Sequence, residues 1–246
     1  MTENNEIKLN IGVWDHGGQD RFGFMLDSYI REAFTLYIFD GTRINASKEH
    51  FENFNQYLIE KNLREKTYFL ASKSDHDNFS SDEIDGIESV LKTGGWMPNQ
   101  DSIIKYSSKT GENIELVSNL IKQEILKNYS ENSDILNQYK KSGFTINMLG
   151  VGSCGKTTLV SRLQTGEFNQ DTCLTVGPEF SVYSITIDLS DLANNNIIEN
   201  NEQIIAQETI QKNETGIVKK LNYVSLDSLW KKTEELNNEN NSNDNE

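Results

Sequence analysis

The residues with the most specific chemistry lie at 150–157, in the run Gly-Val-Gly-Ser-Cys-Gly-Lys-Thr. This run fits the pattern G-x-x-x-x-G-K-[ST], which binds nucleotide phosphates. Its glycines let backbone N–H groups curl around phosphates, its lysine neutralises their charge, and its threonine hydroxyl can ligate Mg²⁺. We therefore expect a nucleoside triphosphate to contact Gly150, Val151, Gly152, Ser153, Cys154, Gly155, Lys156, Thr157 and Thr158.

A second set of polar residues follows an apolar run near the start of the chain. Asp15 and Gly18 form a D-x-x-G motif after residues 7–14, and such a motif can hold Mg²⁺ through water and contact a terminal phosphate. Thr175 stands nineteen residues after Lys156, and Phe168, which stands twelve after it, could stack on a base. In isolation each signal is weak, since a loop threonine and a core phenylalanine explain the last two equally well.

Two further groups stand at the ends of apolar runs. Ser72, Lys73 and Asp75 follow the apolar run at 67–70. Ser107 is the last residue of the run at 103–107, and Ser108 and Lys109 follow it. Ligands of α/β sheets bind at the carboxyl ends of the strands, so both groups are candidates for contacts with the base.

The elements that must position these residues alternate between two patterns. We expect strands at 7–14, 35–39, 67–70, 103–107, 144–149 and 179–189. Apolar residues at offsets of three and four predict helices at 49–62 and 113–126, and another helix follows the glycine-rich run at 155–163. This alternation predicts an α/β fold with a mainly parallel sheet.

Composition limits the function further. The 246 residues carry a net charge of −15, which argues against nucleic-acid binding because that function needs a clustered basic face. No apolar run approaches the roughly 18 residues of a membrane helix, and Cys154 and Cys173 make no disulfide framework. We expect a soluble, cytoplasmic protein without a C-terminal lipid anchor, because no cysteine lies near the final Asn-Asp-Asn-Glu.

The chain divides by composition into a domain and a tail. Residues 1–189 contain all the predicted strands, with a polar linker at 130–143 between the last predicted helix of the first part and the strand at 144–149. Residues 190–246 are acidic and rich in asparagine, which predicts a largely disordered tail with a possible short element at 217–236.

Together, the segments around residues 15, 72, 107, 150 and 175 resemble the five nucleotide-binding boxes of the Ras superfamily of small GTPases, over about residues 7–189. The family normally runs phosphate loop, switch one, switch two, base box and Ser-Ala-Lys box, whereas here the last three come first. The chain therefore resembles the circularly permuted Ras proteins. The resemblance implies a three-layer P-loop GTPase fold, with a mostly parallel six-stranded sheet and helices on both faces.

Geometry permits such a permutation. The cut would fall in the turn of a hairpin, which makes residues 7–14 the first strand and 179–189 the last. The linker at 130–143 could span at most about 46 Å when extended. A domain of this size is about 40 Å across, so the linker is long enough.

The resemblance also assigns roles in phosphate and metal binding. Lys156 would hold the outer phosphates, Thr157 and Thr175 would ligate Mg²⁺, and Asp15 would support the ion through water. The Gly18 amide would contact the terminal phosphate, and Gln19 would orient the attacking water. By the same resemblance, GTP hydrolysis should be slow and stimulated by a partner.

Base recognition would depend on Asp75, whose carboxylate can accept from the two neighbouring donors of guanine, a pairing that adenine cannot offer. Lys73 would pack along the base and the Ser108 amide would contact the guanine oxygen. The departure from the family is Ser72, which stands where asparagine is usual. The expected guanine-binding residues are Ser72, Lys73, Asp75, Ser107, Ser108, Lys109 and Phe168.

These expectations define a small GTPase that binds GTP and GDP with Mg²⁺ as a signalling switch, with an exchange factor, an activating protein and effectors as partners. An alternative is a pseudo-GTPase scaffold with little or no hydrolysis. An ATPase is disfavoured by Asp75 and Lys109 but left open by Ser72.

Overall fold

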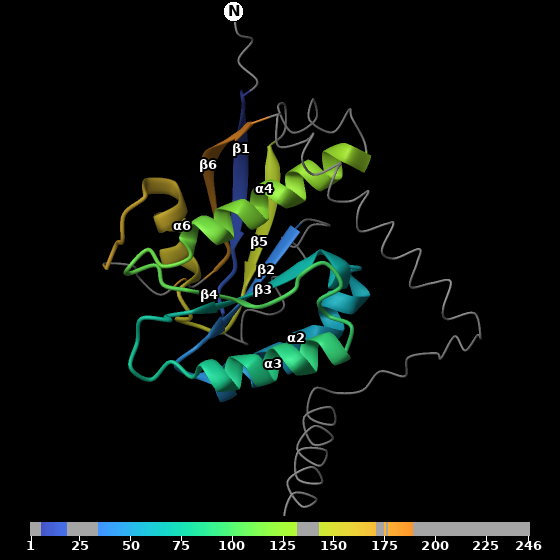
Figure 1. Ribbon diagram of the computed structural model, residues 1–246, viewed down its shortest axis with the longest axis vertical. Coiled ribbons are helices and arrows are strands. Elements are labelled where there is room, and N and C mark those ends of the chain that lie inside the picture. Colours follow the sequence, from blue (N-terminus) through green and yellow to red (C-terminus); the bar gives the residue numbers. More distant parts are fainter. Residues whose placement is uncertain (1–5, 19–33, 132–142, 171–174, 176, 189–246) are drawn as a thin grey trace, which may run out of the picture. The chain divides into compact units, whose positions relative to one another are not determined.

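The computed structural model describes residues 6–18, 34–131, 143–170, 175 and 177–188 (Figure 1). Gln19, Cys173, most of the linker at 130–143 and the tail at 190–246 lie outside the described residues. The chain separates into two compact units, the first made of Met1–Ile11, Ile121–Phe144 and Ser184–Tyr223, and the second of Gly12–Leu120, Thr145–Tyr183 and Val224–Glu246. All the described candidate site residues belong to the second unit.

Six strands form one sheet in the order β4-β3-β2-β5-β1-β6. Their bounds are β1 Glu6–Asp15, β2 Phe34–Asp40, β3 Thr67–Ser72, β4 Ile104–Tyr106, β5 Phe144–Leu149 and β6 Glu179–Asp188. β2 pairs in parallel with β3 and with β5, and β3 pairs in parallel with β4. The predicted α/β class and mostly parallel six-stranded sheet are confirmed, and the predicted strand ranges differ from these bounds only at their ends.

β6 lies beside β1 at one edge of the sheet. In the first unit, Ser184 donates to the Asn10 side chain at 3.0 Å. In the second unit, the rings of Trp14 and Phe180 lie 4.8 Å apart. The partner's number falls by four as the β1 residue rises by four, which is the pattern of antiparallel strands. The first and last described strands are therefore antiparallel neighbours.

Four helices accompany the strands in the described residues, namely α2 Ile44–Glu60, α3 Ser81–Thr93, α4 Ile114–Glu131 and α6 Lys156–Thr165, with a short 3₁₀ turn at Arg64–Lys66. α3 was not predicted, although its sequence carries a start signal: the Ser80 side chain accepts from the Glu83 N–H at 3.4 Å. No helix in this part of the chain is both long and apolar enough to cross a membrane.

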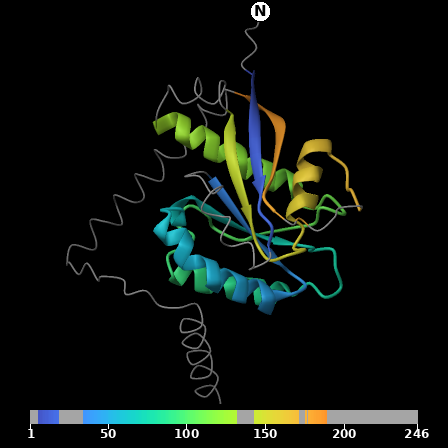
Figure 2. The same cartoon turned by 180° about the vertical axis from the view of Figure 1, so that it is seen from behind.

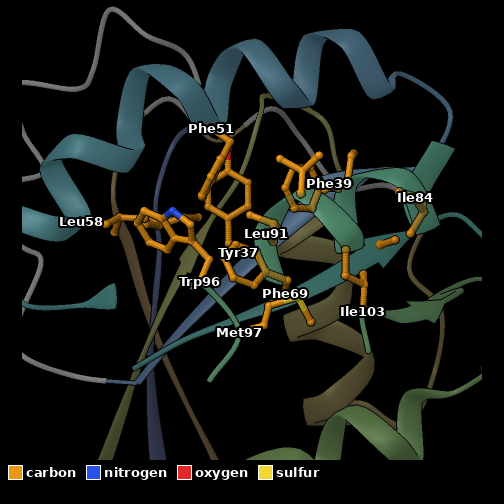
Figure 3. Packing of buried hydrophobic residues seen from close by; sticks show 14 of the residues in the cluster. Tyr37, Phe39, Phe51, Leu58, Phe69, Ile84, Leu91, Trp96, Met97 and Ile103 are labelled. Atoms are coloured by element: carbon orange, nitrogen blue, oxygen red, sulfur yellow. The ribbon is translucent and has the colours of Figure 1, made fainter. Parts of the chain in front are cut away.

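The main core of the second unit is aromatic (Figure 3). Tyr37 and Phe39 of β2 and Phe69 of β3 meet Phe51 of α2, and the Tyr37 and Phe51 rings are 4.9 Å apart in a T-shaped arrangement. Trp96 packs edge-on against Phe51 of α2 at 5.1 Å. α2 and α3 lie side by side over this core in both ribbon views (Figures 1 and 2).

β2 and β3 are buried along their whole length. Because alternate side chains of a strand point to opposite faces, both faces of these strands are covered, as in parallel sheets generally. Asp40 and Ser72 are the last residues of β2 and β3, and they are paired across the two strands. The fold therefore brings functional side chains together at the carboxyl edge of the sheet.

Candidate nucleotide-binding site

The phosphate loop at residues 150–155 connects β5 to α6 and turns at glycines. Gly150 has φ of 141° and Gly155 has φ of 94°, both in the left-handed region that other residues rarely adopt. A Cβ at Gly150 would lie 2.3 Å from the Ile38 carbonyl oxygen, so the loop touches the backbone of β2. α6 begins directly after the loop, and its first N–H groups and dipole favour anions.

Lys156, the first residue of α6, turns its side chain back into the loop and is 5% exposed. Its ammonium donates to the carbonyl oxygens of Gly150 at 2.8 Å and Val151 at 3.1 Å. The free thiol of Cys154 lies 3.8 Å from the same nitrogen. A buried cation held by neutral carbonyl groups is a strong attractor for the oxygen atoms of an anion.

A carboxylate and two hydroxyl groups meet next to this loop. Thr157 donates to Asp15 Oδ2, and its hydroxyl lies 2.8 Å from that of Thr175. The Thr175 hydroxyl also lies 3.5 Å from Asp15 Oδ2. The residues come from β1, α6 and the segment before β6, and they are the three predicted to hold Mg²⁺. The structure therefore brings together oxygen atoms of Asp15 and Thr157, which are more than 140 positions apart in the chain.

Among the described residues, only one of the two oxygens of the Asp15 carboxylate has hydrogen-bond partners. Asp15 is 3% exposed, and its second oxygen, Oδ1, is buried and accepts no hydrogen bond from the part of the chain that the structure describes. Burial raises the pKa of Asp15, while the bond from Thr157 and the charge of Lys156 oppose that rise. Such a carboxylate would gain a partner by binding a cation.

The residues after Asp15 lie close to the phosphate loop. A Cβ at Gly18 would come 2.2 Å from the Gly150 carbonyl oxygen and 2.5 Å from the Gly152 nitrogen, so only glycine fits there. Burial lowers the pKa of His16 to about 4, which keeps its imidazole neutral at pH 7. The D-x-x-G segment is therefore in contact with the loop, as far as the structure describes it.

A cavity of about 260 Å³ adjoins the other side of the loop. The expected guanine-binding residues contribute most of its lining outside the loop, together with one unpredicted histidine. The lining residues are Ser72, Lys73, Asp75, His76, Ser108, Lys109, Ser153, Cys154, Gly155, Thr158 and Phe168. Phe168 is 38% exposed, which is the exposure expected of a ring that could stack on a ligand rather than fill the core.

Asp75 is held by Ser107 and Lys109, which follow β4. The Ser107 hydroxyl donates to Asp75 Oδ1 at 2.6 Å and accepts from the Thr110 N–H at 3.1 Å. The Lys109 ammonium lies 3.8 Å from Asp75 Oδ2, and its side chain is 69% exposed. One oxygen of Asp75 is thus fixed by the buried Ser107 hydroxyl, while the other lies near the exposed Lys109 ammonium. The carboxylate therefore has a fixed orientation in the cavity.

Ser72 connects β3 to the loop at residues 150–155. Its hydroxyl lies 2.6 Å from the Cys154 carbonyl oxygen and 3.2 Å from the Phe39 carbonyl oxygen. The hydroxyl has one proton, and the shorter distance indicates that it donates to the Cys154 carbonyl oxygen. The unusual serine is therefore compatible with a loop anchored to β3.

Besides His76, two residues of this region were not predicted. Asp40, the last residue of β2, is completely buried and binds Lys73 at 2.8 Å, and Arg43 binds both Asp40 and the Gly152 carbonyl oxygen. A charged residue at the carboxyl end of a buried parallel strand is a sequence signal for Asp40 itself, but not for its contacts with Arg43 and Lys73.

No family model, curated protein or solved structure matches this chain. Among the described residues, no group of three or more histidine, cysteine, aspartate or glutamate residues is arranged to hold a metal. The oxygen cluster at Asp15 has a single carboxylate and two hydroxyl groups, so it is a different kind of donor set.

Proposed function

We propose that the chain binds GTP and GDP with Mg²⁺ and hydrolyses GTP slowly, as a circularly permuted member of the Ras type. The observation that carries the proposal is the meeting of Asp15 with Thr157 and Thr175 beside Lys156. The permuted order of the boxes requires that these distant segments converge at one phosphate loop.

The phosphate-binding part rests on charge and backbone geometry. Lys156 is buried among carbonyl groups, and phosphate oxygens would supply the negative charge that such an ammonium favours. The amides that open α6 add hydrogen-bond donors and positive potential. These groups bind the phosphates of any nucleoside triphosphate, and they do not choose the base.

The oxygen cluster fits magnesium. Mg²⁺ is usually held by one or two carboxylates together with substrate phosphates, and Asp15 Oδ1 is a buried oxygen in need of a partner. Thr157 and Thr175 would supply the hydroxyl ligands and Asp15 the negative charge. A bound Mg²⁺ would neutralise the charge that develops on the phosphate oxygens during hydrolysis.

Choice of guanine would come from Asp75. Ser107 fixes one of its oxygens, which orients the carboxylate so that it can accept from two adjacent donors on a base. Guanine offers such a pair of donors and adenine does not. Lys73 and Phe168 line the same cavity and would contact the faces of the base.

Hydrolysis would depend on positioning and charge neutralisation, since phosphoryl transfer needs no covalent intermediate with the protein. By resemblance, Gln19 orients the attacking water and the Gly18 amide contacts the terminal phosphate. The same resemblance implies an exchange factor, an activating protein and effectors as partners.

The test is single-turnover hydrolysis of GTP with Mg²⁺ by the wild-type chain and by Gln19→Leu. We expect the rate to fall by about tenfold or more, because a side chain that positions the reacting water contributes at least that much. Gln56→Leu is a matched control, since Gln56 is exposed on α2 and donates to Glu60 in the same helix. Equal rates for all three proteins, with GTP still bound, would favour the scaffold without hydrolysis.

A further inference from the structure

The feature that the proposed function leaves unexplained is the buried carboxylate of Asp40. Asp40 is 0% exposed and accepts hydrogen bonds from Thr42, from Arg43 at 2.8 Å and from Lys73 at 2.8 Å. A fully buried carboxylate needs paired cations. Here both cations bind the same oxygen atom, Oδ2, so a shift of one ammonium or guanidinium group changes the field at the other.

Arg43 carries this connection to the phosphate loop. The same Nη2 atom that lies 2.7 Å from Asp40 Oδ2 donates to the Gly152 carbonyl oxygen at 2.6 Å. In a trans peptide the C=O and the next N–H point in opposite directions. Because Arg43 holds the Gly152 carbonyl on its own side, the Ser153 N–H is turned to the other side of the loop.

Other carbonyl groups of the loop also accept hydrogen bonds from side chains. Ser72 holds the Cys154 oxygen, and Lys156 holds the oxygens of Gly150 and Val151. Of the loop amides, that of Cys154 donates to the Val151 carbonyl oxygen at 3.2 Å. Because side chains hold the carbonyl oxygens of Gly150, Gly152 and Cys154, the remaining amides can form a concave nest of N–H groups for an anion.

Lys73 carries the connection to the base cavity. It lines the cavity with Asp75, and its backbone has φ of 65°, a conformation that is uncommon for lysine. Its ammonium nevertheless points to Asp40 rather than to Asp75. A base that packs along Lys73 would therefore act on a side chain already tied to Asp40.

We propose that Asp40 and Arg43 are positioning residues that couple the base cavity, through Lys73, to the phosphate loop, through Gly152. The inference rests on the proposed function, because it concerns how the two parts of that nucleotide site act together. Neither residue needs to touch the nucleotide. They set the orientation of the loop amides before phosphate binds. They also make that orientation depend on whether a base occupies the cavity.

The first test compares a ligand with phosphates and one without. Equilibrium dissociation constants for GDP with Mg²⁺ and for guanosine are measured on the wild-type chain and on Arg43→Gln. We expect GDP affinity to fall about tenfold, because a charged hydrogen bond to the loop is lost, while guanosine affinity changes by less than about twofold. A merely structural role would weaken both ligands alike or neither.

A matched control is available in Arg64, which also binds glycine carbonyl oxygens, those of Gly94 and Gly95, but away from the site. Arg64→Gln should leave the affinities for GDP and guanosine unchanged. Arg43→Lys should restore part of the GDP affinity, since one ammonium can bind Asp40 or the loop but lacks the planar fork that reaches both.

The second test measures coupling with a double-mutant cycle of Lys73→Met and Arg43→Gln on GDP affinity. We expect the fold-loss of GDP affinity in the double variant to be at least threefold smaller than the product of the two single fold-losses. Both changes interrupt the same chain of contacts, so the second adds less than the first. Strictly multiplicative losses would overturn the coupling. Unchanged GDP affinity in Arg43→Gln would overturn the positioning role alone, whereas a wild-type chain that binds no guanine nucleotide would overturn the proposed function and this inference together.

Discussion

Two parts of the candidate site differ in how they are built. We call Asp15, Thr175 and residues 150–157 the phosphate half, and residues 72–75 and 107–109 the base half. In the phosphate half Lys156, Asp15 and Thr175 are at most 8% exposed, and the lysine bonds to backbone. In the base half Lys109 is 69% exposed and pairs with a side chain.

This difference follows from what each half would recognise. Phosphate groups are alike in every nucleotide, so backbone amides and a buried cation suffice, and a rigid loop binds them without reorganising. A base must be distinguished from similar bases, which requires a side chain with a particular arrangement of acceptors. We therefore expect changes in the phosphate half to abolish binding and changes in the base half to alter its specificity.

The largest effect should come from Lys156→Ala. Removing this buried ammonium should lower GDP affinity about a thousandfold, or about 4 kcal/mol, because a desolvated charge contact is lost. Lys105→Ala is the control, since that ammonium binds Asp85 and Ser81 in an exposed pair that is worth little. Isothermal titration calorimetry gives both constants, and a loss below tenfold for Lys156→Ala would contradict the distinction between the halves.

Histidine titration tests whether the phosphate half is as buried as the core. His16 follows Asp15 of the phosphate half in the chain, and His50 lies in the core beside Tyr37. Burial lowers the pKa of each to about 4. The unfolded chain, with a histidine pKa of about 6.5, binds protons that the folded chain does not. Stability is therefore complete above about pH 6.5 and falls as the pH drops to about 4, by on the order of 3 kcal/mol per histidine.

Chemical denaturation of wild type, His16→Asn and His50→Asn between pH 7 and pH 4 measures this loss. Each substitution should remove a similar share of the pH dependence, and contributions from the carboxyl groups cancel in the difference between curves. A His16→Asn curve parallel to that of the wild type, with only His50→Asn flattened, would mean that water reaches His16 and the phosphate half is open.

Asp75→Asn should exchange specificity rather than abolish binding. The amide donates where the carboxylate accepted, so GDP affinity should fall about thirtyfold, or about 2 kcal/mol, while xanthosine diphosphate becomes the better ligand because its base has a carbonyl where guanine has an amine. Competition binding measures both. Asp85→Asn is the matched control on α3, and an unchanged preference for GDP in Asp75→Asn would remove Asp75 from base recognition.

The smallest effect should come from Ser72→Ala, which leaves the Cys154 carbonyl without its side-chain donor. We expect the free energy of unfolding to fall by about 1 kcal/mol and GDP affinity by about fivefold. Thr93→Ala removes an exposed bond to the Ser89 carbonyl oxygen within α3, outside both halves, and should change neither quantity. Identical denaturation curves for both variants would show that Ser72 does not anchor the loop.

The parts of the fold that were predictable are those encoded by local patterns. The glycine spacing at 150–155 and the apolar run before it indicated a loop between β5 and α6, and both elements formed there. α3 was missed even though Ser80 and Glu83 mark its start. Its apolar residues Ile84, Ile87, Val90 and Leu91 have helical spacing, so the omission was avoidable.

The site was less predictable because it depends on long-range register. The meeting of Asp15 with Thr157 and Thr175 could be anticipated only from the resemblance and its permuted order. The Asp40 network could not, since it needs the parallel pairing of β2 with β3, which places Asp40 opposite Ser72, and the rotamer of Arg43. Neither is determined by neighbouring sequence.

The proposed guanine specificity is tested most directly by the nucleotide that the protein retains. The purified chain, prepared with Mg²⁺, is denatured and the released nucleotides are identified and quantified by chromatography. The account predicts GDP or GTP approaching one equivalent per chain, and a markedly lower yield after treatment with EDTA because Asp15, Thr157 and Thr175 would lose their metal. Adenine nucleotide, or no nucleotide, would contradict it.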